Sequence, residues 1–250
     1  MTAGAVDYVL ALADDALVSA QRLGWWISRA PELEEDLALA NIGLDQLGQA
    51  RMLLTHAGAL EGQGRTEDDL AYFRDVGEFR NVQLVERAQE DFGVAMARLL
   101  LVSVWQRELY AALRHSTDAT LAAIATKALK EVTYHLDHAE HWVLRLGDGT
   151  EESHDRMQAA LDAEWPYLAE LFDGSWLDPA VVTSGLGVDP ASLEAPVRRC
   201  LAEAVARATL SLPVGSPAAT GGRRGVHTDQ MRALLDEMQS LARAHPGATW

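Results

Sequence analysis

Apolar residues recur every three or four positions along most of this chain, the spacing that places them on one face of an α-helix. Such a repeat between Leu10 and Ile27 predicts a first helix of roughly twenty residues. A second helix should begin near Pro31, since proline suits the first turn of a helix. We expect its leucines to form one seam that faces the interior: Leu33, Leu37, Leu44, Leu47 and Leu54. The polar, Gly-rich stretch 58–65 predicts a loop.

Two further long helices are predicted, over residues 75–115 and 118–146, and a shorter helix follows them. Pro166 should kink that shorter helix or start a new one, because proline cannot continue the backbone hydrogen bonds of a helix. Beyond residue 173, Gly and Pro divide the chain into short elements. The pattern ends with a helix over 193–210, a Gly/Pro-rich loop over 212–226 and a last helix over 228–243.

Four long helices in antiparallel succession form a bundle. No strand-like alternation of polar and apolar residues is long enough to compete with this pattern. The predicted fold class is therefore all-α, a ferritin-like four-helix bundle with additional C-terminal helices. We expect a single domain over residues 1–250, with the bundle core at 1–173 and a C-terminal helical extension at 174–250 that holds the Gly/Pro-rich loop.

The composition of the chain restricts the kinds of molecule that it can bind and the compartment in which we expect it. With 250 residues, of which 48% are apolar, the chain can bury a sizeable core. Its formal net charge of -16 repels polyanions, so no nucleic acid is expected as a partner. The single cysteine, Cys200, cannot form an intrachain disulfide. The first residues lack a basic start, and Asp14 and Asp15 interrupt their apolar stretch, so we expect a cytoplasmic chain without signal peptide or membrane span.

The candidate chemistry lies on two of the long helices. Di-iron carboxylate sites in helical bundles take a Glu from each of two helices and a Glu-x-x-His motif from each of the other two. The corresponding segments here read Asp45-Gln46-Leu47-Gly48 and Glu131-Val132-Thr133-Tyr134. Gly48 and Tyr134 thus stand where the histidines are needed. We interpret the site as degenerate, and predict no metal, no cofactor and no catalytic residue in this chain.

Two carboxylates inside a bundle need partners, because an uncompensated buried charge is costly. Lys127 stands one turn before Glu131 on the same predicted helix. Our hypothesis is a buried network of ion pairs or hydrogen bonds that replaces the metal and comprises Asp45, Glu131, Lys127, His135 and His138. The alternative is an independent ferritin-like di-iron oxidase or iron-binding protein, with metal held by Asp45, Glu131 and one of those two histidines.

Two arginines stand in the Gly-rich segment near the C-terminus. The run Gly221-Gly222-Arg223-Arg224-Gly225 predicts a flexible loop in an otherwise acidic protein. Arg223 and Arg224 are therefore candidate contacts for a phosphate-bearing ligand or for an acidic patch on a partner. A solvated loop between helices is the competing interpretation.

Three long stretches carry a resemblance to a known family. They read ELEEDLALANIGLDQLGQAR (32–51), KALKEVTYHLDHAEHWVLRLGDGTEESHDRMQ (127–158) and GGRRGVHTDQMRALLDEMQSLARAHPGATW (221–250). Over nearly its whole length the chain resembles the structural subunits, PaaC, of the bacterial multicomponent phenylacetyl-CoA epoxidases.

The resemblance implies a ferritin-like protein without a functional di-iron site, in agreement with Gly48 and Tyr134. It implies a hetero-oligomer in which non-haem di-iron is held by a related catalytic subunit, with accessory and flavin/iron-sulfur reductase subunits as further partners. Such a complex adds one oxygen atom from O₂ across the aromatic ring of phenylacetyl-CoA in aerobic phenylacetate catabolism. The expected function is that of a non-catalytic structural subunit that pairs with the catalytic subunit and stabilises it.

Overall fold

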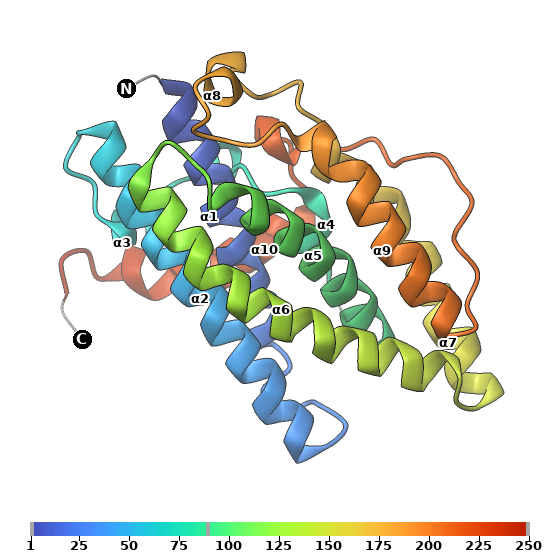
Figure 1. Cartoon of the computed structure of the whole chain (residues 1–250). Helices are drawn as coiled ribbons and strands as arrows, with labels where there is room; N and C mark the ends of the chain where they lie inside the picture. The colour runs from blue at the N-terminus through green and yellow to red at the C-terminus, as the bar shows by residue number, and fades with distance from the viewer. Residues whose placement is uncertain (1–2, 89–90, 249–250) are drawn as a thin grey trace. The chain divides into compact units, whose positions relative to one another are not determined.

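Regular secondary structure is helical throughout the part of the chain that the computed structural model describes, residues 3–88 and 91–248 (Figure 1). Those residues form no β-strand, and their β pairing is one isolated bridge between Gly221 and Val226. The all-α prediction is confirmed, and the long paired helices are consistent with a ferritin-like bundle. None of the described helices combines the length and the hydropathy that a membrane span requires.

The chain divides into two compact units. Unit 1 comprises Met1–Ala88, Trp176–Ser184 and Thr220–Trp250, and unit 2 comprises Gln89–Ser175 and Gly185–Ala219. The segment expected to form a C-terminal extension, residues 174–250, is thus shared between the two units. The organisation of residues 1–250 as a single domain stays a prediction.

Unit 1 is built on a hairpin of two long antiparallel helices, α1 (Ala3–Gly24) and α2 (Leu33–Glu61) (Figure 1). Its shorter elements are α3 (Glu67–Tyr72), the 3₁₀ turn η1 (Val76–Glu78), α4 (Gln83–Glu86), α8 (Pro179–Thr183), the 3₁₀ turn η4 (Gly222–Arg224) and α10 (Asp229–Ala244). Every residue from Tyr8 to Val18 of α1 is buried, so neighbours cover this helix on all sides. The last element, α10, confirms the helix predicted at 228–243.

The second helix begins close to the predicted position but ends later than predicted. Its first turn carries Glu34, Glu35 and Asp36, which suit the positive end of the helix dipole. It ends at Gly62, whose φ of 71° is the left-handed conformation that glycine adopts readily at a helix C-terminus. The loop predicted over 58–65 therefore starts only after Glu61, because Gly58 remains inside the helix.

The prediction that the leucine seam of α2 faces the interior is wrong for most of its length. Leu33, Leu37 and Leu44 are 72%, 58% and 63% exposed, and Leu47 is also exposed. Leu54 is the member of the seam that is buried. The reason is that α2 carries a second apolar face, and that face is the buried one: Leu39, Ile42, Ala50, Leu53 and Ala57.

The helix predicted over 75–115 is interrupted. The chain forms η1, then an extended stretch over residues 79–82, then the single turn α4, and the long helix α5 begins only at Phe92. Carboxylates of α1 supply the reason. Asp14 accepts the backbone N–H of Arg80 at 2.8 Å and Asp15 accepts that of Val82 at 2.9 Å, so these groups are satisfied outside a helix.

Unit 2 is built on a second long hairpin, α5 (Phe92–Leu113) and α6 (Ala119–Gly147). Its other elements are α7 (Glu151–Glu164), the 3₁₀ helix η2 (Trp165–Phe172), the 3₁₀ turn η3 (Pro190–Leu193) and α9 (Glu194–Arg207). The boundary at Trp165 confirms that Pro166 starts a new element. A buried salt bridge between Arg98 of α5 and Glu164 of α7, with 2.9 Å from Nε to the carboxylate, ties the hairpin to its neighbour.

Candidate functional site

The two positions that would have to supply histidine ligands do not offer metal-binding side chains. On α2, a Cβ atom added at Gly48 would meet no other atom within 4 Å, so nothing occupies the place of a ligand. On α6, Tyr134 is 54% exposed and its ring lies 6.4 Å from the ring of His138. Tyr134 therefore covers part of the outer surface of α6.

The ion pair expected on α6 is present but is not buried. Lys127 and Glu131 form an i,i+4 salt bridge in which the Lys127 side chain is 57% exposed. A pair of this kind contributes about 0.3–0.5 kcal/mol because solvent screens it. The expectation of a buried Lys127–Glu131 pair is thus corrected, since Lys127 lies on the solvent side of the helix.

The other members of the hypothetical network are Asp45, His135 and His138, and their side chains differ in burial. His135 is fully buried on α6, and His138 of the same helix is partly buried. Asp45 of α2 is partly exposed and belongs to unit 1, whereas the two histidines belong to unit 2. The participation of Asp45, His135 and His138 in one network stays a prediction.

The donor set does not fit a di-iron pair. Such a pair needs about four carboxylates and two histidines. Across residues 3–88 and 91–248, no group of three or more His, Cys, Asp or Glu side chains could hold a metal ion.

Arg223 does not lie in a flexible, exposed loop, so this part of the prediction is wrong. It is 5% exposed, and its guanidinium donates hydrogen bonds to the Asp15 carboxylate at 2.7 Å and to the carbonyl of Ala11 at 3.1 Å. Gly222 is needed because a Cβ there would clash with the carbonyl oxygen of Asn81. The glycines of this segment thus serve close packing. Arg224 is exposed, and its contact with a CoA ester or a partner stays a prediction.

Arg223 belongs to a cluster of buried ionisable side chains in unit 1, which we call the buried charge network. Its members are Asp14, Asp15, Arg74, Glu86, Arg223 and His227. Three carboxylates thus face three cations, so the formal charges cancel. The network joins α1 to residues 74–86 and to residues 223–227, which are far apart in the sequence.

The first half of the network surrounds the paired aspartates of α1. Arg74 donates to Asp14 at 3.0 Å, and its guanidinium lies 4.1 Å from the centre of the Phe79 ring. Burial raises the pKa of Asp15, although the charge of Arg223 and its hydrogen bond oppose that shift. The sequence does indicate that Asp14 and Asp15 need charged partners, because these two aspartates interrupt an apolar helix and a buried charge without a partner is costly.

The second half is centred on Glu86. Its carboxylate accepts from the backbone N–H of Thr228 at 2.7 Å and from the amide of Asn81 at 3.0 Å, and it lies 2.7 Å from Nδ1 of His227. Nε2 of His227 lies 3.0 Å from the carbonyl oxygen of Phe79. Since a carbonyl and a carboxylate both accept, the two ring nitrogens both donate, and the ring is an imidazolium.

The charge state of His227 follows from its surroundings. Burial disfavours the imidazolium, but the hydrogen bonds to Glu86 and to the Phe79 carbonyl outweigh it and raise the pKa of His227. Every member of the network has a charged partner inside the protein. This arrangement is suited to holding segments together and leaves no free acid or base for a substrate.

The comparisons with known proteins agree with the resemblance noted in the sequence. The family described as phenylacetic acid catabolic protein matches residues 1–250. The chain belongs to this family. A relative from Escherichia coli (strain K12), the C component of 1,2-phenylacetyl-CoA epoxidase, is 45% identical over 243 residues, which cover 97% of this chain and 98% of the relative.

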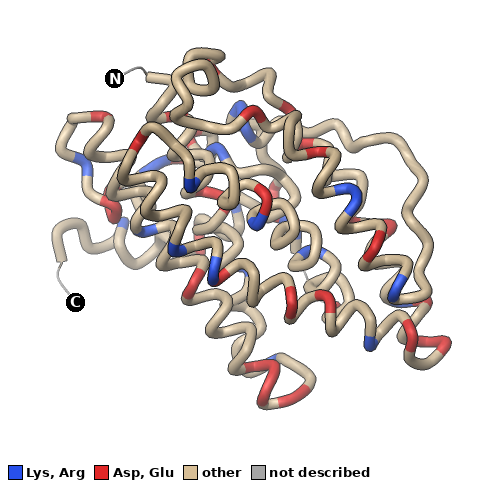
Figure 2. Tube along the Cα trace, viewed as in Figure 1, with Lys and Arg blue, Asp and Glu red and all other residues tan. Residues whose placement is uncertain are grey.

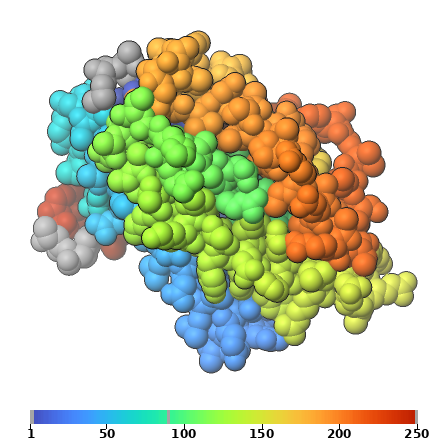
Figure 3. All heavy atoms as spheres, in the orientation of Figure 1, coloured from blue at the N-terminus to red at the C-terminus, as the bar shows by residue number. Residues whose placement is uncertain are grey.

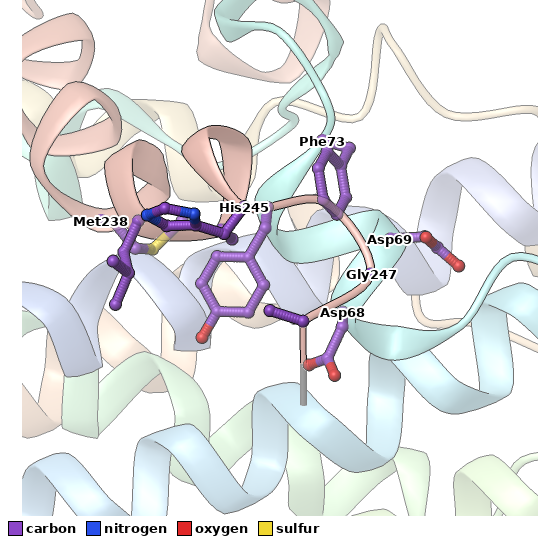
Figure 4. Close-up of a pocket in the computed structure, with 10 residues that line it drawn as sticks. Asp68, Asp69, Phe73, Met238, His245 and Gly247 are labelled. Atoms are coloured by element: carbon purple, nitrogen blue, oxygen red, sulfur yellow. The ribbon is translucent and has the colours of Figure 1, made fainter. Parts of the chain in front are cut away.

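A groove of about 490 Å³ lies between α3 and α10 (Figure 4). Its apolar side chains include Tyr72, Phe73, Met238 and Leu241. Asp68 and Asp69 also line it, so an anionic ligand such as a CoA ester would be repelled.

We expect Arg223→Met to lower the free energy of unfolding by about 3–5 kcal/mol, because it leaves the buried Asp15 carboxylate without its cation. Urea denaturation measures the change. The matched control is Arg224→Met at the exposed neighbouring position, where we expect a change within about 0.5 kcal/mol. Adding Asp15→Asn to Arg223→Met should recover much of the loss. Equal stability of the two methionine variants would contradict the assigned role of Arg223.

We expect His227→Gln to remove a pH dependence of stability. The pKa of His227 is raised by folding, so its contribution is complete below about pH 6.5 and is lost as the pH rises through the folded pKa. The stability difference between parent and variant should therefore shrink with rising pH, by about 1.4 kcal/mol for each unit of pKa shift. Thermal melts from pH 5.5 to 9 measure it. The exposed His141→Gln is the control, and parallel curves for parent and His227→Gln would refute the assignment.

Proposed function

We propose that this chain is a non-catalytic structural subunit of a multicomponent phenylacetyl-CoA epoxidase in aerobic phenylacetate catabolism. The observation that carries the proposal is the 45% identity, over 97% of the chain, to the C component of that epoxidase from Escherichia coli. Identity of this extent over both whole chains supports the same place in a hetero-oligomer. In that place the chain pairs with the catalytic subunit and stabilises it.

The residues of the candidate site support the assignment of the metal to another subunit. Gly48 and the exposed Tyr134 supply no ligand, and Lys127 compensates Glu131 without a metal. We therefore assign the non-haem di-iron to the catalytic partner and no cofactor to this chain. Phenylacetyl-CoA binds to the catalytic partner, and accessory and reductase subunits complete the assembly.

Two further parts of the proposal concern the chain itself. The two helical hairpins, α1–α2 and α5–α6, are the elements that a single ferritin-like domain would combine. The catabolic role and the acidic composition support a cytoplasmic protein without nucleic-acid or membrane partners.

The test is the iron and zinc content of this chain purified alone and after coexpression with the catalytic subunit. We expect no bound metal above background in the chain alone, and iron in the complex in proportion to the catalytic subunit. About two irons in the chain alone would overturn the proposal in favour of an independent di-iron protein with Asp45, Glu131, His135 and His138 as ligands. Failure of the two chains to form a complex would also overturn it.

A further inference from the structure

Helix α2 has two apolar faces, and the structure covers one of them. The covered face, which includes Leu39, Ile42 and Leu53, is fully buried. The other face is what we call the α2 seam: Leu33, Leu37, Ala40, Leu44 and Leu47. A surface helix of a globular protein normally buries its apolar residues and exposes its polar ones, whereas the four leucines of the α2 seam are exposed. The α2 seam therefore lacks the covering that its composition calls for.

The spacing of the seam specifies what shape would cover it. Its members step by four and three residues in alternation, which is the heptad spacing of two helices that pack with interlocking side chains. From Leu33 to Leu47 the seam extends about 20 Å at the rise of an α-helix. The surface thus fits one partner helix of about four turns, crossing at the shallow angle of such pairs.

The turn before α2 continues the apolar surface. Trp25 and Ile27 are 38% and 50% exposed, and the backbone N–H of Ser28 is bonded to the carboxylate of Asp36 in the first turn of α2. This bond holds the turn against the start of the seam. Tryptophan is enriched among the residues that carry most of the binding energy of protein interfaces, so Trp25 adds a candidate anchor to the apolar surface.

The borders of the seam indicate the chemistry of its partner. On one side Asn41 and Gly48 flank the leucines, and the space beside Gly48 is empty to 4 Å, so another helix can approach closely. At the start of α2, Glu34 flanks the seam, and acidic residues gather there (Figure 2). The start of α2 and the turn before it also lie at the surface in the space-filling view (Figure 3). A complementary helix would carry basic side chains at the end that meets Glu34.

We infer that the α2 seam is the docking surface for a helix of the catalytic epoxidase subunit, an inference that rests on the function proposed above. The partner helix has an apolar face with heptad spacing and basic residues at one end. The function proposed above requires a contact with the catalytic subunit, whereas a second copy of this acidic chain would bring its own net charge of -16 to the contact.

The test compares the binding of purified catalytic subunit to this chain and to its double variant Leu37→Glu/Leu44→Glu, by titration calorimetry. Both leucines are exposed, so the variant should keep the far-UV circular dichroism and the urea midpoint of the parent. We expect the dissociation constant to rise at least about 100-fold, since two charges are placed in the centre of the contact. The control is Leu241→Glu on α10, a leucine of similar exposure, for which we expect a change within about threefold.

Three outcomes would overturn the inference in distinguishable ways. If the parent binds the catalytic subunit and the double variant binds equally well, the surface is wrong while the proposed function stands. If the parent is a dimer by light scattering and the double variant is a monomer that still binds the catalytic subunit, a second copy occupies the seam. If the parent does not bind the catalytic subunit at all, the proposed function itself fails.

Discussion

The structure of unit 1 depends on the cost of burying two adjacent carboxylates in a helix that neighbours cover on all sides. Asp14 and Asp15 are 0% and 1% exposed, and an isolated charge in such surroundings would destabilise the fold by several kcal/mol. Their partners are distant in the sequence: Arg74 and the backbone of residues 80–82 on one side, and Arg223 on the other. The carboxylates therefore hold one segment in an extended conformation and fix the C-terminal segment against α1.

Acidic residues of both units are paired with cationic side chains of the same chain. The buried acids of unit 1 are compensated by arginine and histidine, and Glu131 of unit 2 is compensated by Lys127. Such pairs specify which segments meet. A subunit built in this way supplies a fixed surface to an assembly, and the α2 seam is the part of that surface with the composition of an interface.

The sequence predicted the fold class well because periodicity is a local property. The helices near 118–146 and 228–243 and the new start at Pro166 follow from spacing and from proline, with no knowledge of the neighbours. The prediction of one helix over 75–115 was wrong because the backbone N–H groups of Arg80 and Val82 bond to carboxylates of α1, which stand 66 and 67 residues earlier. Local propensity cannot reveal such a contact.

The sequence shows which residue types stand at the candidate site, but it does not show what these residues contact. Gly48 and Tyr134 are visible in the sequence, whereas the open space beside Gly48 and the exposure of Tyr134 come from the structure. Periodicity located the leucines of α2 on one face but could not say which of two apolar faces the core would cover. Likewise the glycines around Arg223 suggested mobility, whereas they permit close contact with residue 81.

The central claim is that this chain supplies structure and no metal ligand to the epoxidase. The most direct test is phenylacetyl-CoA-dependent oxygen consumption by the reconstituted complex, with this chain either as parent or as Asp45→Asn/Glu131→Gln. These substitutions remove both carboxylates of the degenerate site while nearly preserving side-chain size. We expect activity and iron content within about twofold of the parent complex, because the altered positions would hold no iron. A loss of activity of about 100-fold or more, together with a loss of iron, would contradict it.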